Sequence, residues 1–133
     1  MRYLVSFLVL CFLCSCSNGP KKLSSEEISK LKTVIEVEAN KVNKQMAGQK
    51  VDEMTTLLSA VFDGTDFVYT YEIDEDIFPI EKMRVLKDDF TQHLKETWVD
   101  NPAKPSLNAI NAKVVYMYTG SLSEDTLKIE FEP

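Results

Sequence analysis

The chain has few of the residues on which catalysis depends. Its 133 residues include three cysteines, Cys11, Cys14 and Cys16, so no disulfide, thiolate nucleophile or cysteine metal ligand is possible beyond position 16. His93 is the one histidine, and no nucleophile motif lies beside it. The motifs G-x-S-x-G and H-E-x-x-H and the glycine-rich phosphate loops are also absent. The sequence therefore predicts no catalytic residue, no cofactor and no enzyme.

Positive charge is also scarce. The chain carries 15 Lys and Arg against 21 Asp and Glu, a net charge of −6. Binding to nucleic acid or to anionic lipid headgroups depends on a basic patch. The composition therefore argues against nucleic acid as a partner.

The first 16 residues form a recognisable signal. Arg2 is followed by an apolar run from Tyr3 to Leu13, and the run ends in Leu13-Cys14-Ser15-Cys16. A short basic start, an apolar stretch and small residues before a cleavage site are typical of a secretory signal. The run is too short for a membrane-spanning helix, which needs about 20 residues.

The four-residue box resembles that of bacterial lipoproteins. The resemblance implies cleavage after Ser15, a diacylglyceryl group on the Cys16 thiol, and an acyl chain such as palmitate on the new amine. An ordinary cleaved signal is the alternative. Ser17 is not the aspartate that retains lipoproteins at the inner membrane, so the resemblance favours the cell envelope, at the outer membrane and facing the periplasm.

This interpretation divides the chain into three parts. Residues 1–15 are the cleaved signal peptide, and residues 16–22 are the lipidated Cys16 with a flexible Gly- and Pro-containing tether. Residues 23–133 form a single domain. Loss of residues 1–15 removes one charged side chain, Arg2, which takes the net charge from −6 to −7.

A helix is predicted from Ser24 onward. Ser24 and Glu27 have the spacing of a capping box, Leu23 and Ile28 that of a hydrophobic staple, and Gly48 is a suitable end. An apolar stripe at spacings of three and four indicates a core-facing helix: Ile28, Leu31, Ile35, Ala39, Val42 and Met46.

A β-hairpin is predicted around Asp63-Gly64. Residues 55–62 are rich in β-formers, residues 67–73 alternate between apolar and polar, and Asp-Gly is a strong hairpin signal. The pairing predicts that Leu58, Ala60 and Phe62 share the core face with Phe67, Tyr69 and Tyr71, whereas Leu57 and Ser59 point away. A helix over 51–62 is the alternative.

The second half repeats this pattern. A helix is predicted from Pro79, with a stripe of Met83, Leu86, Phe90, Leu94 and Trp98, followed by a connection over 101–111 and strands over 114–119 and 126–132. The fold class is α+β: two α-β-β units form a four-stranded antiparallel sheet with two helices packed on one face.

The mature domain also resembles a group of small bacterial envelope proteins of unassigned function. The resemblance is carried by Asn43-Lys44-Gln45, Val51 to Thr55, Tyr69-Thr70-Tyr71 and Tyr116-Met117-Tyr118. It implies a fold and no activity. The cysteines that those proteins carry are replaced here by Thr97-Trp98-Val99 and Phe131-Glu132-Pro133.

Two groups of residues are candidates for a catalytic or metal-binding site. His93 lies one residue off the apolar stripe, which favours a surface or boundary position over a general base. Asp74, Glu75 and Asp76 could bind calcium together with Asp63 or Asp66. A solvated acidic loop at the N-terminus of the second helix explains them without metal, so no metal site is predicted.

The sequence favours a non-enzymatic binding or accessory lipoprotein, attached to the lipid bilayer through acylated Cys16 and contacting a protein of the envelope. One alternative is an inhibitor or immunity-type lipoprotein against an envelope hydrolase. Another is a carrier of a small apolar ligand between sheet and helices, which requires a pocket rather than a filled core.

Overall fold

The computed structural model describes residues 22–133. The predicted signal peptide, Cys16 and all but the last residue of the predicted tether lie outside the described residues. No helix within residues 22–133 has the length and apolar character needed to cross a membrane.

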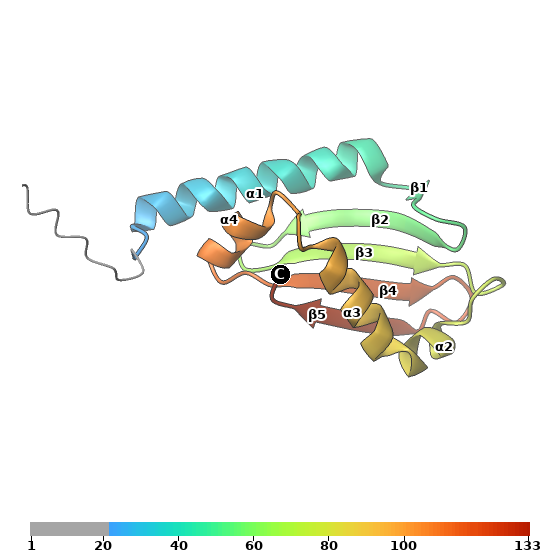
Figure 1. The fold of residues 1–133 in the computed structure, drawn as a ribbon. Helices are drawn as coiled ribbons and strands as arrows, with labels where there is room; N and C mark the ends of the chain where they lie inside the picture. The colour runs from blue at the N-terminus through green and yellow to red at the C-terminus, as the bar shows by residue number, and fades with distance from the viewer. Residues whose placement is uncertain (1–21) are drawn as a thin grey trace, which may run out of the picture.

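The described chain forms a five-stranded sheet and four helices (Figure 1). The prediction of an α+β fold is confirmed at the level of class, and its two-helix, four-strand detail is wrong. The strands follow one another across the sheet in chain order. The elements are α1 (Ser25–Met46), β1 (Gln49–Lys50), β2 (Thr55–Phe62), β3 (Phe67–Ile73), α2 (Ile80–Val85), α3 (Lys87–Thr97), α4 (Lys104–Ala109), β4 (Val114–Gly120) and β5 (Thr126–Phe131).

Helix α1 begins at the predicted capping box. The Ser24 amide donates to Glu27 Oε2 at 2.8 Å, and the Glu27 amide donates to Ser24 Oγ at 3.2 Å. Near its other end, α1 is joined to β2 by the side chain of Asn43. Asn43 Nδ2 donates to the Ala60 carbonyl and the Ala60 amide donates to Asn43 Oδ1, both at 2.6 Å. Because β1 pairs only with Leu57 and Thr56, this amide satisfies an edge of β2 that no strand covers.

The β2–β3 hairpin is confirmed, and the helix alternative for 51–62 is wrong. Phe62 pairs with Phe67 and Ala60 with Tyr69, so the turn between the strands has four residues, 63–66. A bulge between Leu57 and Ser59 shifts the register, however, so Leu57 is 2% exposed and Leu58 is 43% exposed. The prediction that Leu58 is buried and Leu57 points away was wrong, because a bulge adds a residue and reverses the alternation behind it.

The all-antiparallel sheet was also wrong, because β3 and β4 are parallel. Between them the chain passes through α2, α3 and α4, which return it to the end of the sheet where β3 began. A helical crossover of this kind places the two strands side by side in the same direction. The β2–β3 and β4–β5 pairs are antiparallel, as predicted.

The predicted second helix is divided in two. Leu86 has φ −95° and ψ 17°, which ends α2 before α3 starts, and its side chain is 42% exposed rather than in the predicted stripe. Met83 and Trp98 are buried, and Phe90 and Leu94 pack against the core, so the rest of the stripe is confirmed.

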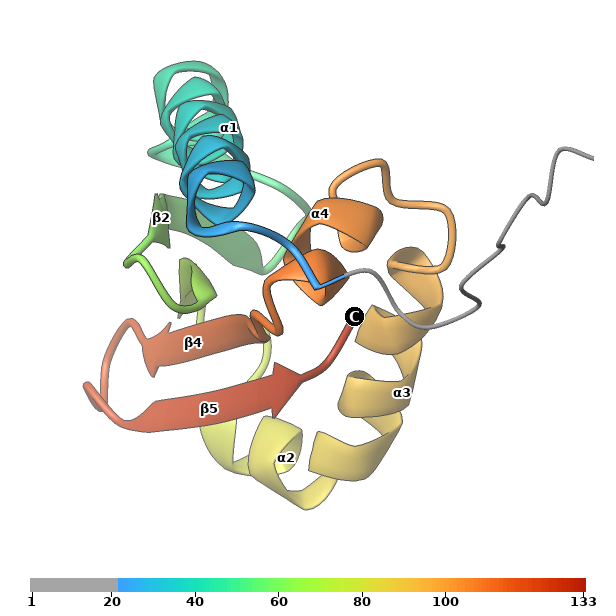
Figure 2. The ribbon, with the colours of Figure 1, turned by 90° about the vertical axis from the view of Figure 1, so that its left-hand side faces the viewer.

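The predicted connection over 101–111 contains a short helix, α4. Pro105 lies in its first turn, where the missing amide hydrogen costs no hydrogen bond. Leu107 follows and is fully buried. Figure 2 shows α2, α3 and α4 on one side of the sheet and α1 beside β2.

Candidate ligand-binding site

Four tyrosines stack on the helix-covered face of the sheet. The parallel register of β3 and β4 places Tyr69 beside Tyr116 and Tyr71 beside Tyr118. The ring centroids of these pairs are 5.2 and 5.4 Å apart, with interplanar angles of 18° and 19°. We call these four residues the tyrosine ladder. Because the ring faces contact one another, the ladder offers ring edges and hydroxyl groups to its surroundings.

The hydroxyls of the ladder differ in their partners. Tyr116 Oη accepts a hydrogen bond from Trp98 Nε1 at 2.8 Å, which fixes the end of α3 over the sheet. The hydroxyls of Tyr69, Tyr71 and Tyr118 have no hydrogen-bond partner among residues 22–133. Every fully buried side-chain nitrogen or oxygen of that part of the chain has one. These three hydroxyls therefore open onto accessible space.

That space includes a cavity of about 300 Å³ between the tyrosine ladder and helices α2 and α3. Tyr71 and Tyr118 line it, and the Tyr118 residue as a whole is only 6% exposed. No Lys or Arg of the described chain lines it. We call it the ladder cavity; its lining residues are Val51, Asp52, Met54, Thr55, Tyr71, Ile73, Phe78, Met83, Phe90, His93, Leu94, Thr97, Tyr116 and Tyr118.

Burial keeps these tyrosines in the neutral form. Desolvation is the largest cause that raises the pKa of Tyr71 and Tyr118, and the neighbouring tyrosines and the carboxylate of Asp52 raise it further. At neutral pH each side chain is therefore a hydroxyl that can both donate and accept a hydrogen bond, and not a phenolate. The cavity combines an apolar wall with a few polar groups, which is the composition of small-ligand sites.

A second cavity, of about 500 Å³, lies between α1 and the segment that leads into α4. Tyr69 and Trp98 line it on the ladder side. Glu38 and Lys41 line it from α1, and their charged groups are 3.9 Å apart, so the charges of this wall are balanced. Trp98 lines this second cavity and Tyr116 lines the ladder cavity, and the two side chains are hydrogen-bonded to each other.

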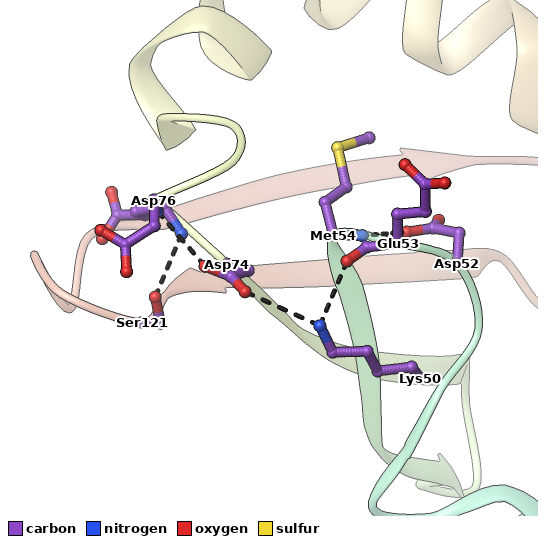
Figure 3. Close-up of polar contacts among 8 residues, drawn as sticks. Lys50, Asp52, Glu53, Met54, Asp74, Asp76 and Ser121 are labelled. Atoms are coloured by element: carbon purple, nitrogen blue, oxygen red, sulfur yellow. Dashed lines mark hydrogen bonds and ion pairs between the residues drawn. The ribbon is translucent and has the colours of Figure 1, made fainter.

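The acidic loop after β3 is occupied by contacts within the protein (Figure 3). Asp74 Oδ2 lies 3.7 Å from Lys50 Nζ, and the Glu75 amide donates to Ser121 Oγ at 3.1 Å. The Glu75 carboxylate accepts hydrogen bonds from the amides of Leu122 and Ser123, at 2.8 and 2.6 Å. The loop therefore joins the end of β3 to the β4–β5 turn.

The calcium ligands considered from the sequence are not brought together. Asp63 and Asp66 precede β3, whereas Asp74 follows it, so the strand separates the two groups. Asp63 Oδ1 accepts from the amides of Thr65 and Asp66 within its own turn. Residues 22–133 contain no group of three acidic, histidine or cysteine side chains placed to hold a metal ion.

His93 is exposed on α3, the predicted kind of position, and it also lines the ladder cavity. Sequence reasoning did not identify the cavity. The repeated Tyr-x-Tyr of β3 and β4 was the available signal, and with parallel pairing it would have predicted the tyrosine ladder.

No protein-family model matches the chain, and no curated protein matches it in sequence. A solved structure does resemble it: a crystal structure described as that of a "putative secreted protein" from Pseudomonas aeruginosa, with a TM-score of 0.68 and 15% sequence identity. The match covers 83% of this chain and 96% of that one. At this identity the likeness shows a shared fold.

Proposed function

We propose that the chain is a lipid-anchored envelope protein that binds a small, mostly apolar ligand in the ladder cavity and does not catalyse a reaction. The observation that carries this proposal is that Tyr71 and Tyr118, whose hydroxyls have no hydrogen-bond partner within residues 22–133, line a cavity with largely apolar walls. In a filled core such groups would be hydrogen-bonded or replaced by phenylalanine. A ligand that accepts or donates a hydrogen bond would supply the partner that these two hydroxyls lack within the described part of the chain.

The envelope location is supported by the N-terminal signal and by the likeness to a protein described as secreted. Acyl chains on Cys16 would hold the domain at the outer membrane, since each buried CH₂ contributes about 0.8 kcal/mol to membrane binding. Metabolic labelling with a palmitate analogue tests this. Cys16→Ser should abolish labelling and Cys14→Ser should retain it, and labelled Cys16→Ser would refute the anchor.

The binding site is tested by filling the cavity. Leu94→Trp enlarges a lining side chain and should weaken binding of 2-naphthalenemethanol at least tenfold. Leu86→Trp is the matched control, because Leu86 is exposed and lies outside the cavity lining. Calorimetric titration of the acylated chain in nanodiscs, with empty nanodiscs subtracted, gives both affinities. Equal affinities would place the binding site elsewhere.

A role as an accessory protein that contacts another envelope protein is the second candidate. It is supported by two exposed apolar residues that lie together at the end of α2, Val85 at 83% and Leu86 at 42% exposure. Exposed apolar groups gathered in this way are typical of interaction sites. A photo-crosslinking amino acid at position 85 should capture one discrete envelope protein in living cells, whereas the same group at exposed Glu96 should not.

A further inference from the structure

We infer that the ladder cavity selects small organic cations that have an apolar body, such as aryl-alkyl ammonium ions. This inference rests on the proposed function, because it names the class of ligand that the same cavity would take.

The charges of the lining residues carry the inference. Asp52 is the one carboxylate among them, and no Lys or Arg belongs to the lining that the structure describes. His93 is the one titratable nitrogen base among the lining residues. The lining therefore holds one carboxylate and no lysine or arginine to offset it.

The carboxylate of Asp52 is not neutralised by the neighbouring lysine. Lys50 Nζ instead lies 3.7 Å from Asp74 Oδ2 and donates to the Glu53 carbonyl at 3.2 Å (Figure 3). The Met54 amide donates a hydrogen bond to Asp52 Oδ1 at 2.9 Å. Within residues 22–133 Asp52 forms no salt bridge, so its charge is available to a ligand.

The hydroxyls of Tyr71 and Tyr118 are compatible with the same ligand. Hydroxyl oxygens accept hydrogen bonds from an ammonium group, and they can equally donate to an anion, so the hydroxyls alone do not choose a sign. The uncompensated carboxylate of Asp52 gives the cavity a preference for positively charged ligands, because it attracts a cation and repels a carboxylate ligand. The apolar walls, which include Ile73, Phe78 and Leu94, suit the body of the molecule.

The volume of the ladder cavity limits the size of the ligand. A cavity of about 300 Å³ is at the lower end of small-ligand sites, so a single fused ring system is a suitable probe. The second cavity is a useful contrast, because Glu38 and Lys41 balance each other there and give no preference for either sign.

Three probes with one ring system test the inference: 2-naphthylmethylammonium, 2-naphthalenemethanol and 2-naphthoate. Each is titrated at pH 7.5 and low salt into the acylated chain in phosphatidylcholine nanodiscs, with empty nanodiscs subtracted. We expect the cation to bind about fivefold more tightly than the alcohol, and the anion most weakly, as for a partly exposed charge pair. The advantage of the cation should fall as salt is raised.

Asp52→Asn removes the charge and keeps an oxygen that can accept from the Met54 amide. It should lower the affinity for the cation to that for the alcohol and leave the alcohol unchanged. Glu53→Gln is the matched control, because it removes the same charge one residue away and outside the lining, and it should change neither affinity.

Each outcome is decisive. Equal affinities of cation and alcohol in the unmodified protein, or an unchanged cation affinity in Asp52→Asn, would overturn the inference and leave the proposed ligand site standing. Failure of all three probes to bind would overturn the proposed function and the inference together.

Discussion

Replacing Asn43 should be among the most destabilising changes on α1, although asparagine is a polar residue in a helix. Its side-chain amide makes two hydrogen bonds of 2.6 Å to the backbone of Ala60, a residue with 0% exposure. Asn43→Ala would leave a buried N–H and a buried C=O without partners. Each such group costs about 1–3 kcal/mol, so a loss of about 3 kcal/mol in the free energy of unfolding is expected.

Asn40→Ala is the matched control. Asn40 lies on an exposed face of the same helix, so its replacement reports the gain of about 0.5 kcal/mol that alanine brings through helix propensity. Urea denaturation followed by circular dichroism measures both variants. Asn43→Ala should unfold at clearly lower urea than the parent and Asn40→Ala at equal or higher urea. Equal midpoints for the two would refute the pairing of Asn43 with the edge of β2.

Three further predictions concern the sheet and its turn. Ala60→Asp should lose several kcal/mol of stability in urea, because it places a carboxylate at a fully buried position, whereas Ser59→Asp, at a half-buried position, should lose far less; equal stabilities would contradict the observed register. Gly120→Ala should cost about 1–2 kcal/mol, because a Cβ there would lie 2.5 Å from the Glu75 carboxylate, and the cost should largely vanish in a Glu75→Ala background. Hydrogen bonds from the amides of Ser123 and Leu122 lower the pKa of Glu75 in the folded protein. The stability they contribute is therefore present above the ordinary pKa of 4.5 and lost as pH falls through the lower folded value, so Glu75→Gln should flatten the loss of stability below about pH 5.

The sequence predicted the elements that local chemistry determines. The capping box of Ser24 and Glu27 located the start of α1, and Asp63-Gly64 located the first hairpin, because both signals act over a few residues. The exposure of Leu58 depends on a bulge, which leaves no mark on the apolar pattern of a short strand. The repeated α-β-β pattern predicted an antiparallel sheet, whereas the helical segment between β3 and β4 is long enough to return the chain and pair the two strands in parallel.

The candidate site was less predictable than the fold. The ladder cavity exists because the parallel register stacks Tyr71 beside Tyr118 while α3 covers them, and each of these facts is tertiary. Asp52 belongs to the loop between β1 and β2, and no sequence pattern relates it to His93 on α3, although both line the cavity. The lipid anchor, by contrast, is a prediction from residues 13–16 alone.

The most direct test of the ligand site is the position of a bound probe. With 2-naphthylmethylammonium added to the acylated protein in nanodiscs, intermolecular nuclear Overhauser contacts should connect its ring protons to Tyr71, Tyr118 and Leu94. Contacts confined to the exposed Val85 and Leu86 at the end of α2, or to the lipid, would contradict the account.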